Sequence, residues 1–317
     1  MQARPIRRAL HGVLLLDKPL GWTSNDALQK SKGLLRALKG GHTGTLDPLA
    51  TGLLPLCFGA ATKFSQVSLD AEKRYRATLH LGQRTSTADR EGEVIEQRQV
   101  DVDLASIERT CQRFVGAIDQ RPPMHSALKH QGRALYEYAR DGIEIERPTR
   151  PVQIHRIDIV DWQSPLLVID VVCSKGTYIR TLAEDIGQAL GCGAHLAALR
   201  RTGSGPLDVA QAVTLEQLGA MDDDARLACL LPADVLLASW PEVRLPDDEA
   251  GRFLSGLRRR VALADAPAVR VYRVSPAPQA SPGGPQARAF LGSAHICGGE
   301  LIADRLLSPP EVQALLA

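Results

Sequence analysis

The stretch Gly40–Phe64, GGHTGTLDPLATGLLPLCFGAATKF, places a single carboxylate, Asp47, between a Gly/Thr-rich turn and an apolar run. Gly44 and Gly52 permit backbone conformations that other residues resist, and Pro48 restricts the chain directly after the acid. Such a frame would aim the Asp47 side chain and let a ligand approach it. Asp followed by Pro is equally typical of a helix N-cap, so Asp47 could instead cap a helix that starts at Pro48. From the residues alone both interpretations stay open.

The rest of the chain mixes strand and helix patterns without Rossmann-type alternation. Tyr75 to Leu81 alternates apolar and polar residues, which predicts a half-buried strand. Further strands are expected at 12–22 (broken at Lys18-Pro19), 152–162 and 166–173, helices at 27–38, 103–118, 134–140 and 177–190, a loop at 40–44 and a short helical segment at 51–63. Thr23 to Asn25 and Thr177 are the expected helix caps. These patterns predict an α+β fold with a mostly antiparallel mixed sheet flanked by helices.

The chain of 317 residues fits one large domain followed by a small one. We expect the first domain to span 1–237 and the second 238–317, because short β-like pieces at 268–274, 289–291 and 301–303 follow the apparent boundary. Between the first two lies the Pro/Gly/Ser-rich stretch SPAPQASPGGPQ, which is typical of a flexible loop.

The composition excludes several classes of protein. The formal net charge is only +2, so no global positive field can be argued. The six cysteines form no CxxC pair or zinc spacing, and neither HExxH nor a metal-spaced acid pair occurs, so no metal site is expected. No apolar run approaches a membrane span, and the apolar stretch after the basic N-terminus is too short for a signal peptide, so we expect a cytoplasmic protein.

A second candidate site lies at the junction of a strand and a helix, Ser174-Lys175-Gly176-Thr177-Tyr178-Ile179-Arg180. Arg180 falls in the first helical turn, where the helix dipole disfavours a cation unless an acid offsets it. Asp47 is a candidate partner, although a solvated Arg is the commoner outcome. Tyr75 and Tyr178 are either core residues or aromatic platforms under a flat substrate, and His42 is either an acid/base or a loop residue.

The stretch from Gln120 to Pro151 is polar, basic and punctuated by prolines, as binding loops often are. It supplies candidate phosphate contacts: Arg121, Lys129, Arg133, Arg140, Arg147 and Arg150. For any one of these cations a merely solvated position remains the alternative.

Taken together, the segments resemble the TruB-type tRNA pseudouridine-55 synthases of bacteria. The matching motifs follow the family's order along nearly the whole chain: GVLLLDKPLGWTSNDALQK, GGHTGTLDPLATGLLPLCFGAATK, KRYRATLHLGQRTSTADREGEV, PPMHSALKHQGRALYEYARDGIEIERPTRPV, CSKGTYIRTLAEDIGQALGCGAHLAALRRTGSG and the late GELIADRLLS. The resemblance implies isomerisation of one uridine in the T loop of tRNA by base flipping, with no cofactor.

The resemblance also implies roles for individual residues, carried over by motif position. Asp47 would be the essential carboxylate, and Arg180 would pair with it. Tyr75 would stack on the uracil and could assist removal of the C5 proton. His42 would hold or flip the nucleotide, and the remaining pocket residues would be Tyr178 and Leu199.

On the same basis, the insertion at about 121–150 would close over the T loop, and a PUA-like second domain would meet the acceptor-stem side of the tRNA. The family suggests a monomer that needs no protein partner. Two departures are visible: His125 stands where the family commonly has Tyr, and Ser275–Arg288 looks like an expansion. Two alternative functions remain, a non-catalytic RNA-binding or tRNA-folding protein and a guide-RNA-dependent rRNA pseudouridine synthase.

Overall fold

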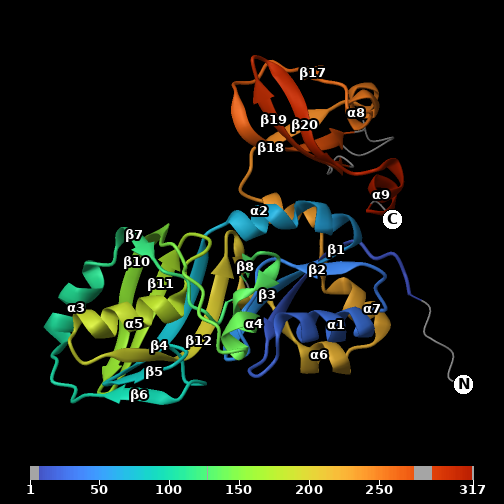
Figure 1. Ribbon diagram of the computed structural model, residues 1–317. Helices are drawn as coiled ribbons and strands as arrows, with labels where there is room; N and C mark the ends of the chain where they lie inside the picture. Colours follow the sequence, from blue (N-terminus) through green and yellow to red (C-terminus); the bar gives the residue numbers. More distant parts are fainter. Residues whose placement is uncertain (1–6, 127, 275–287, 316–317) are drawn as a thin grey trace, which may run out of the picture.

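The computed structural model describes residues 7–126, 128–274 and 288–315, and the expected expansion falls almost wholly outside them. A large mixed sheet forms the body of the protein (Figure 1). Its strands lie in the order β14 (Val213–Thr214), β1 (Gly12–Lys18), β3 (Ala50–Phe58), β12 (Ala194–Ser204), β4 (Lys73–Leu81), β11 (Leu166–Cys173), β10 (Arg150–Gln163) and β7 (Gly116–Gln120). Short strands join this path at three points: β2 (Gly40–His42) on β3, β13 (Leu207–Asp208) on β12 and β15 (Leu230–Leu231) on β1. Only the β1–β14 and β3–β12 pairs within the described sheet are parallel, so the expected α+β fold with a mostly antiparallel sheet is confirmed.

A second, smaller sheet stands beyond one side of the first (Figure 1). Its strands are β16 (Glu242–Leu245), β18 (Ala266–Val274), β19 (Arg288–Cys297), β20 (Glu300–Leu306) and β17 (Arg259–Arg260). Two hairpins complete the strands, β5 (Gln83–Thr85) with β6 (Val94–Gln97) and β8 (Lys129–His130) with β9 (Arg133–Ala134). The β-like pieces expected after residue 240 are therefore confirmed, whereas the boundary at 237/238 stays a prediction.

The described helices cover both ends of the large sheet, and the last two contact the small sheet. They are α1 (Ser24–Leu34), α2 (Ser65–Asp70), α3 (Leu104–Gln112), α4 (Leu135–Arg140), α5 (Ile179–Ala189), α6 (Leu215–Ala220), α7 (Asp223–Ala228), α8 (Asp247–Leu254) and α9 (Pro309–Ala314), with 3₁₀ turns η1 (Gly59–Phe64), η2 (Val209–Gln211) and η3 (Ala233–Leu237). Figure 1 shows α1 and α6 beside the β1–β3 end and α3 and α5 beside the other end. None of the described helices has the length and apolar character that crossing a membrane requires.

Two predictions around Asp47 were wrong, and one of its two open interpretations is excluded. Residues 40–42 form the strand β2 rather than a loop, and no helix starts at Pro48, so Asp47 is not an N-cap. Residues 50–58 form the buried strand β3, so of the helical segment expected at 51–63 only 59–63 are helical, in the 3₁₀ turn η1. The physical reason is that β3 is covered on both faces: Leu53 and Cys57 lie in one core cluster and Leu54 and Leu56 in another. A strand buried on both faces loses the alternation by which strands are recognised.

Errors in the helices concern their ends. Thr23 caps α1 as expected by accepting from the Asp26 amide, but the helix ends at Leu34 rather than Leu38 because Arg36 takes a positive φ of 51°. Residues 116–118 belong to β7 rather than to the preceding helix. Thr177 does not cap α5, since its hydroxyl donates to the Ser174 carbonyl at 2.9 Å.

The large sheet carries two helix-covered cores that meet at its centre. One lies under α1 and α6, the other under α3 and α5. Tyr75 and Leu199 are partly buried and pack against both cores, because β4 and β12 lie in the middle of the strand order. A cavity is therefore expected at the seam, which is the region where the two cores meet.

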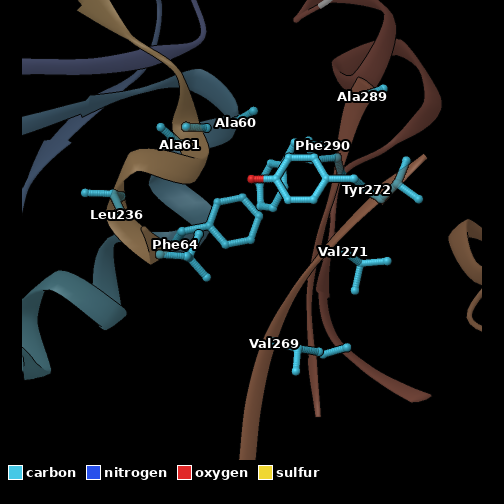
Figure 2. Close-up of a cluster of buried hydrophobic side chains, with 14 of the residues drawn as sticks. Ala60, Ala61, Phe64, Leu236, Val269, Val271, Tyr272, Ala289 and Phe290 are labelled. Atoms are coloured by element: carbon cyan, nitrogen blue, oxygen red, sulfur yellow. The ribbon is translucent and has the colours of Figure 1, made fainter. Parts of the chain in front are cut away.

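The small sheet is docked on the large one through aromatic side chains. Figure 2 shows Phe64, from η1, facing Phe290 and Tyr272 of the small sheet. The Phe64 and Phe290 ring centroids are 5.1 Å apart, and those of Tyr272 and Phe290 5.5 Å. Aromatic pairs in this range stabilise beyond their area burial, so the two sheets share one apolar core.

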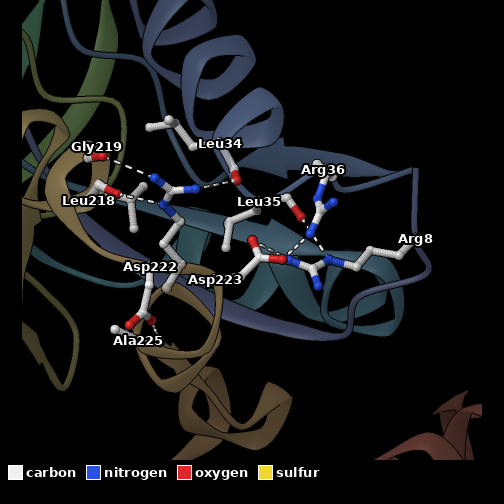
Figure 3. Close-up of polar contacts among 10 residues, drawn as sticks. Arg8, Leu34, Leu35, Arg36, Leu218, Gly219, Asp222, Asp223 and Ala225 are labelled. Atoms are coloured by element: carbon white, nitrogen blue, oxygen red, sulfur yellow. Dashed lines mark hydrogen bonds and ion pairs between the residues drawn. The ribbon is translucent and has the colours of Figure 1, made fainter. Parts of the chain in front are cut away.

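The N-terminal segment is tied to α7 by charge. Asp223 lies between the guanidinium groups of Arg8 and Arg36 (Figure 3). Arg8 also donates to the Leu35 carbonyl at 3.1 Å, just after the end of α1. These contacts fix the chain that leads into β1.

Candidate functional site

Asp47 occupies the turn between β2 and β3, and two glycines shape this turn as expected. Gly44 and Gly52 have φ values of +100° and +99°, which favour glycine. A Cβ at Gly52 would come within 2.3 Å of the Arg201 carbonyl oxygen on the parallel neighbour β12. The glycine therefore lets the two strands approach, and the turn holds Asp47 at the seam between the cores.

Arg180 meets Asp47 from the other half of the molecule. It is the second residue of α5, and its Nη2 atom lies 2.9 Å from Asp47 Oδ2, so the expected partnership is present. The same Nη2 donates to the His125 carbonyl at 2.6 Å, while Nη1 donates to Asp89 Oδ2 at 3.3 Å. The main chain of His125 thus holds Arg180 whatever side chain stands at that position.

The two carboxylates around Arg180 differ in accessibility. The side chain of Asp89 is 4% exposed, whereas that of Asp47 is 41% exposed. Asp89 is further fixed by Thr87, whose hydroxyl donates at 2.6 Å, and by the Glu91 amide at 3.0 Å. One buried acid therefore balances the buried guanidinium, and Asp47 presents its carboxylate outward.

The electrostatic environment of Asp47 is balanced between burial and neighbouring charge. Burial raises the pKa of its carboxyl, and Arg180 is the neighbour that most opposes this rise. Lys18 opposes it more weakly; its own pKa is lowered to about 8, chiefly by burial. A carboxylate with a raised pKa is a stronger base than an ordinary surface acid.

Most of the predicted site residues line one cavity of about 250 Å³. Asp47 and Arg180 form part of its wall, and Tyr75, Tyr178 and Leu199 supply aromatic and aliphatic surface. Burial raises the pKa of both phenols, so they are neutral at neutral pH. A small cavity with flat apolar walls and one carboxylate suits a planar polar ring.

His42 lies apart from this first cavity. It lines a neighbouring one of about 530 Å³, of which Asp47 and Arg180 also form part of the wall. Its Nδ1 atom is buried without a hydrogen-bond partner in the described part of the chain, and burial lowers its pKa. His42 thus has one unsatisfied buried nitrogen, and it shares the wall of this second cavity with Asp47.

The basic excursion packs over this second cavity, which its residues His125, Tyr136 and Arg140 help to line. Arg140 lies 5.2 Å from the Tyr136 ring centroid. Arg133 is already paired with Glu137 and Asp141.

The other cations of the excursion fall into two groups. Arg147 is largely buried and bonds the Pro122 carbonyl at 3.1 Å. Arg121, Lys129 and Arg150 are exposed and form no ion pair with any described residue. Contact of all six cations with RNA stays a prediction.

Two residues of the site escaped sequence reasoning. Nothing in the local sequence around Asp89 nominates it as a site residue. Arg201, which is 1% exposed and lines the 250 Å³ cavity, was not considered. Neither carries a local signal, because its importance arises from partners more than 90 residues away in sequence.

Two family models match consecutive parts of the chain. Residues 32–179 match the model of the TruB family pseudouridylate synthase N-terminal domain, and residues 180–238 match that of the tRNA pseudouridylate synthase B C-terminal domain. The chain is 54% identical to a "tRNA pseudouridine synthase B" of Verminephrobacter eiseniae, over 100% of this chain and 94% of that protein. It is 62% identical to the protein of the same name from Cupriavidus pinatubonensis, over 80% and 81% of the two chains.

Solved structures agree in fold. The chain is similar to a protein in the crystal structure of a Cbf5-Nop10-Gar1 complex, with a TM-score of 0.71, 25% identity, and coverage of 98% of this chain and 89% of that one. A chain in an H/ACA RNP bound to a substrate RNA has a TM-score of 0.69 at 23% identity, over 94% and 86% of the two chains.

Proposed function

The chain belongs to the TruB family of pseudouridine synthases and is an isomerase, and from this premise we propose that it converts uridine 55 in the T loop of tRNA to pseudouridine. The target base is flipped out of its stack into the 250 Å³ cavity, where Asp47 is the catalytic residue. We expect the enzyme to act in the cytoplasm, as a monomer without a protein partner.

The observation that carries the proposal is the ion pair between Asp47 and Arg180. The two residues come from distant segments, and the 2.9 Å contact joins them at the wall of the cavity. The guanidinium is buried, whereas the carboxylate is 41% exposed and lines the cavity. A carboxylate that is held by Arg and open to a cavity is arranged for a substrate.

The chemistry fits this inventory. The N1–C1′ glycosidic bond breaks, the uracil turns, and a C5–C1′ bond forms, so substrate and product have the same atoms. No redox or energy-supplying group is needed for such a rearrangement, and one carboxylate can start it by attacking the sugar or base or by removing a sugar proton. Tyr75 stacks on the uracil, while Tyr178 and Leu199 confine it.

We expect the surfaces around the cavity to bind the RNA. The excursion at about 121–150 lies over the Asp47 side of the site, where it can close on the T loop. Arg121, Lys129 and Arg150 are exposed for phosphate contact. His42 holds or flips the nucleotide from the neighbouring cavity, and the PUA-like domain, 238–317, reaches toward the acceptor stem.

Two other functions compete with this one. A non-catalytic RNA-binding or tRNA-folding protein would not need Asp47, and its outward carboxylate weighs against that function. A guide-RNA-dependent rRNA enzyme is compatible with the fold. The higher identity to proteins named tRNA pseudouridine synthase B, 54–62% against 25%, favours direct action on tRNA.

The test uses the purified chain, an unmodified T-arm stem-loop carrying [5-³H]uridine, and EDTA, with no guide RNA. Because C5 exchanges its hydrogen for a bond to C1′, turnover releases tritium into water. We expect release from the wild type and none from Asp47→Asn, which keeps the shape of the side chain. Both should bind the stem-loop equally well, as measured by fluorescence anisotropy.

Each alternative has its own result. Binding without tritium release by the wild type would support a binding protein, and release only after a guide RNA is added would support the guide-dependent enzyme. Release from a stem-loop whose only labelled uridine lies outside position 55 would overturn the proposed specificity. Substantial turnover by Asp47→Asn would remove that residue from the chemistry.

A further inference from the structure

Arg201 is a buried cation, and no carboxylate in the described part of the chain pairs with it. It lies on β12 with 1% of its surface exposed, and it donates to the carbonyl oxygens of Leu53 and Gly44. Burying a charge without a counter-charge costs several kcal/mol. A residue that is costly in this way and lines the substrate cavity calls for a functional explanation.

The contacts of Arg201 join the two halves of the site. Its Nε donates to the Leu53 carbonyl at 2.6 Å, and Nη2 lies 3.4 Å from the Gly44 carbonyl, three residues before Asp47. Tyr75 is its direct cross-strand partner on β4, and both residues line the 250 Å³ cavity. Arg201 therefore links the turn that carries Asp47 to the strand that carries the Tyr75 phenol.

Arg201 also sets the charge balance around Tyr75. Burial raises the pKa of this phenol, and among its neighbours Arg201 opposes that rise most strongly. The positive field extends further, because Arg201 contributes to the lowered pKa, about 8, of the buried Lys73 on the cavity wall. Negative charge that develops on the Tyr75 oxygen would thus meet a fixed cation at the cavity wall.

We propose that Arg201 is a positioning residue for the isomerisation, which fixes the Tyr75 oxygen at the base and stabilises its phenolate as it accepts the C5 proton. In that step the neutral Tyr75 phenol first releases its own proton to solvent, and the phenolate then takes the proton from C5, while the electron pair of the C5–H bond restores the C5=C6 double bond. The neutral phenol is restored, and its new proton exchanges with solvent. The inference rests on the proposed function, since only a base joined through C5 has this proton to lose.

A purely structural role is the competing explanation, because the Arg201 guanidinium also bonds the carbonyls of Leu53 on β3 and Gly44 in the Asp47 turn. Arg201→Gln removes the charge but keeps an amide donor, and Arg201→Lys keeps the charge but lacks the planar fork. Lys preserves the charge and most of the side-chain volume. Arg201→Lys is therefore expected to fold even if Arg201→Gln does not. Arg200→Gln is the matched control: the next residue on β12 pairs with Asp17 at 2.6 Å and is 41% exposed.

The first readout needs no turnover. The chain has five tyrosines, so ¹³Cζ-tyrosine NMR can follow each phenol through a pH titration, and Tyr75→Phe assigns its signal. We expect Arg201→Gln to raise the Tyr75 pKa clearly, Arg201→Lys to raise it less, and Arg200→Gln to leave it unchanged. An unmoved Tyr75 signal in the folded Arg201 variants would overturn the proposal.

The second readout is a double-mutant cycle on the T-arm substrate. Arg201→Gln should lower kcat by at least about tenfold with little change in KM, and Arg201→Lys should fall between it and the wild type. In the Tyr75→Phe background the same substitutions should cost almost nothing more. An equal loss in both backgrounds would mean that Arg201 acts as a brace alone. Failure of the proposed function would show instead as no turnover by the wild type, with the NMR shifts intact.

Discussion

Asp47 and Asp89 lie against the same guanidinium: Arg180 Nη2 is 2.9 Å from Asp47 Oδ2, and Nη1 is 3.3 Å from Asp89 Oδ2. The side chain of Asp89 is ten times less exposed than that of Asp47, at 4% against 41%. Arg180 can stay paired with the buried carboxylate of Asp89 and still orient the exposed carboxylate of Asp47. The group of Arg180, Asp47 and Asp89 therefore carries one net negative charge, and Asp47 is the carboxylate that faces the cavity.

Asp89→Asn should lower kcat about 10- to 100-fold while tRNA affinity stays near that of the wild type. Without the buried carboxylate, Arg180 pairs with Asp47 alone, and the guanidinium is held less firmly in its orientation. Single-turnover tritium release and anisotropy binding measure the two quantities. Thr87→Val, which removes one hydrogen bond to Asp89 but no charge, should cost less, and equal losses in the two variants would contradict the charge argument.

The acid limb of the pH profile should report Asp47. Burial raises the pKa of its carboxyl, so activity, which requires the carboxylate, is lost as pH falls through that raised value. Removing the Arg180 charge in Arg180→Gln raises the pKa further and should move the acid limb of kcat/KM to higher pH. Arg180→Lys keeps the charge, so the acid limb of this variant should stay near that of the wild type. Its kcat should fall, because Lys lacks the planar fork of Arg. An unshifted limb in Arg180→Gln would assign the limb to another group.

Asp185→Asn should stabilise the protein at pH 7. Burial raises the pKa of Asp185 from 3.8 to about 6, so the unfolded state loses its proton first as pH rises and stability falls across that window. The ionised folded state carries a penalty of about 3 kcal/mol at most, and partial exposure reduces it to about 1–2 kcal/mol.

Urea unfolding at two pH values measures this gain in the free energy of unfolding. The gain should be present at pH 7 and vanish below about pH 4, where Asp185 is protonated in both states. Glu184→Gln is the comparison: Glu184 also raises the Asp185 pKa, but it pairs with Arg84 at 2.9 Å, so its removal should stabilise less than Asp185→Asn. A gain that persists at low pH would have a cause other than charge.

The exposed cations of the excursion should set the salt dependence of tRNA binding. Replacing Arg121, Lys129 or Arg150 by Gln should each reduce the slope of log K against log salt by about 1, uniformly across tRNAs. Arg133→Gln should change it less, because Glu137 and Asp141 already occupy that guanidinium. Equal slopes for all four variants would place the phosphate contacts elsewhere.

Local sequence was sufficient wherever one face of an element was buried. The alternation of Tyr75 to Leu81 predicted β4, and Thr23 predicted the start of α1, because both signals lie within a few residues of the feature they specify. The motifs that carry the family resemblance likewise named Asp47, Arg180 and Tyr75. The α+β class followed from the order of these elements.

Sequence reasoning failed where contacts between distant segments decide the outcome. β3 was read as helical because it is apolar on both faces, and only the two cores that cover it make it a strand. Asp47 resembled a helix cap until the turn was seen to lead into that strand.

The charge balance of the site belongs to the tertiary structure alone. Asp89 lies 91 residues from Arg180, and Arg201 lies 157 residues from Gly44. Local sequence determined which side chains are present and how their backbones turn. Which charges are buried together depends on how the two cores meet, because burial and Coulomb energy depend on distance in space rather than along the chain.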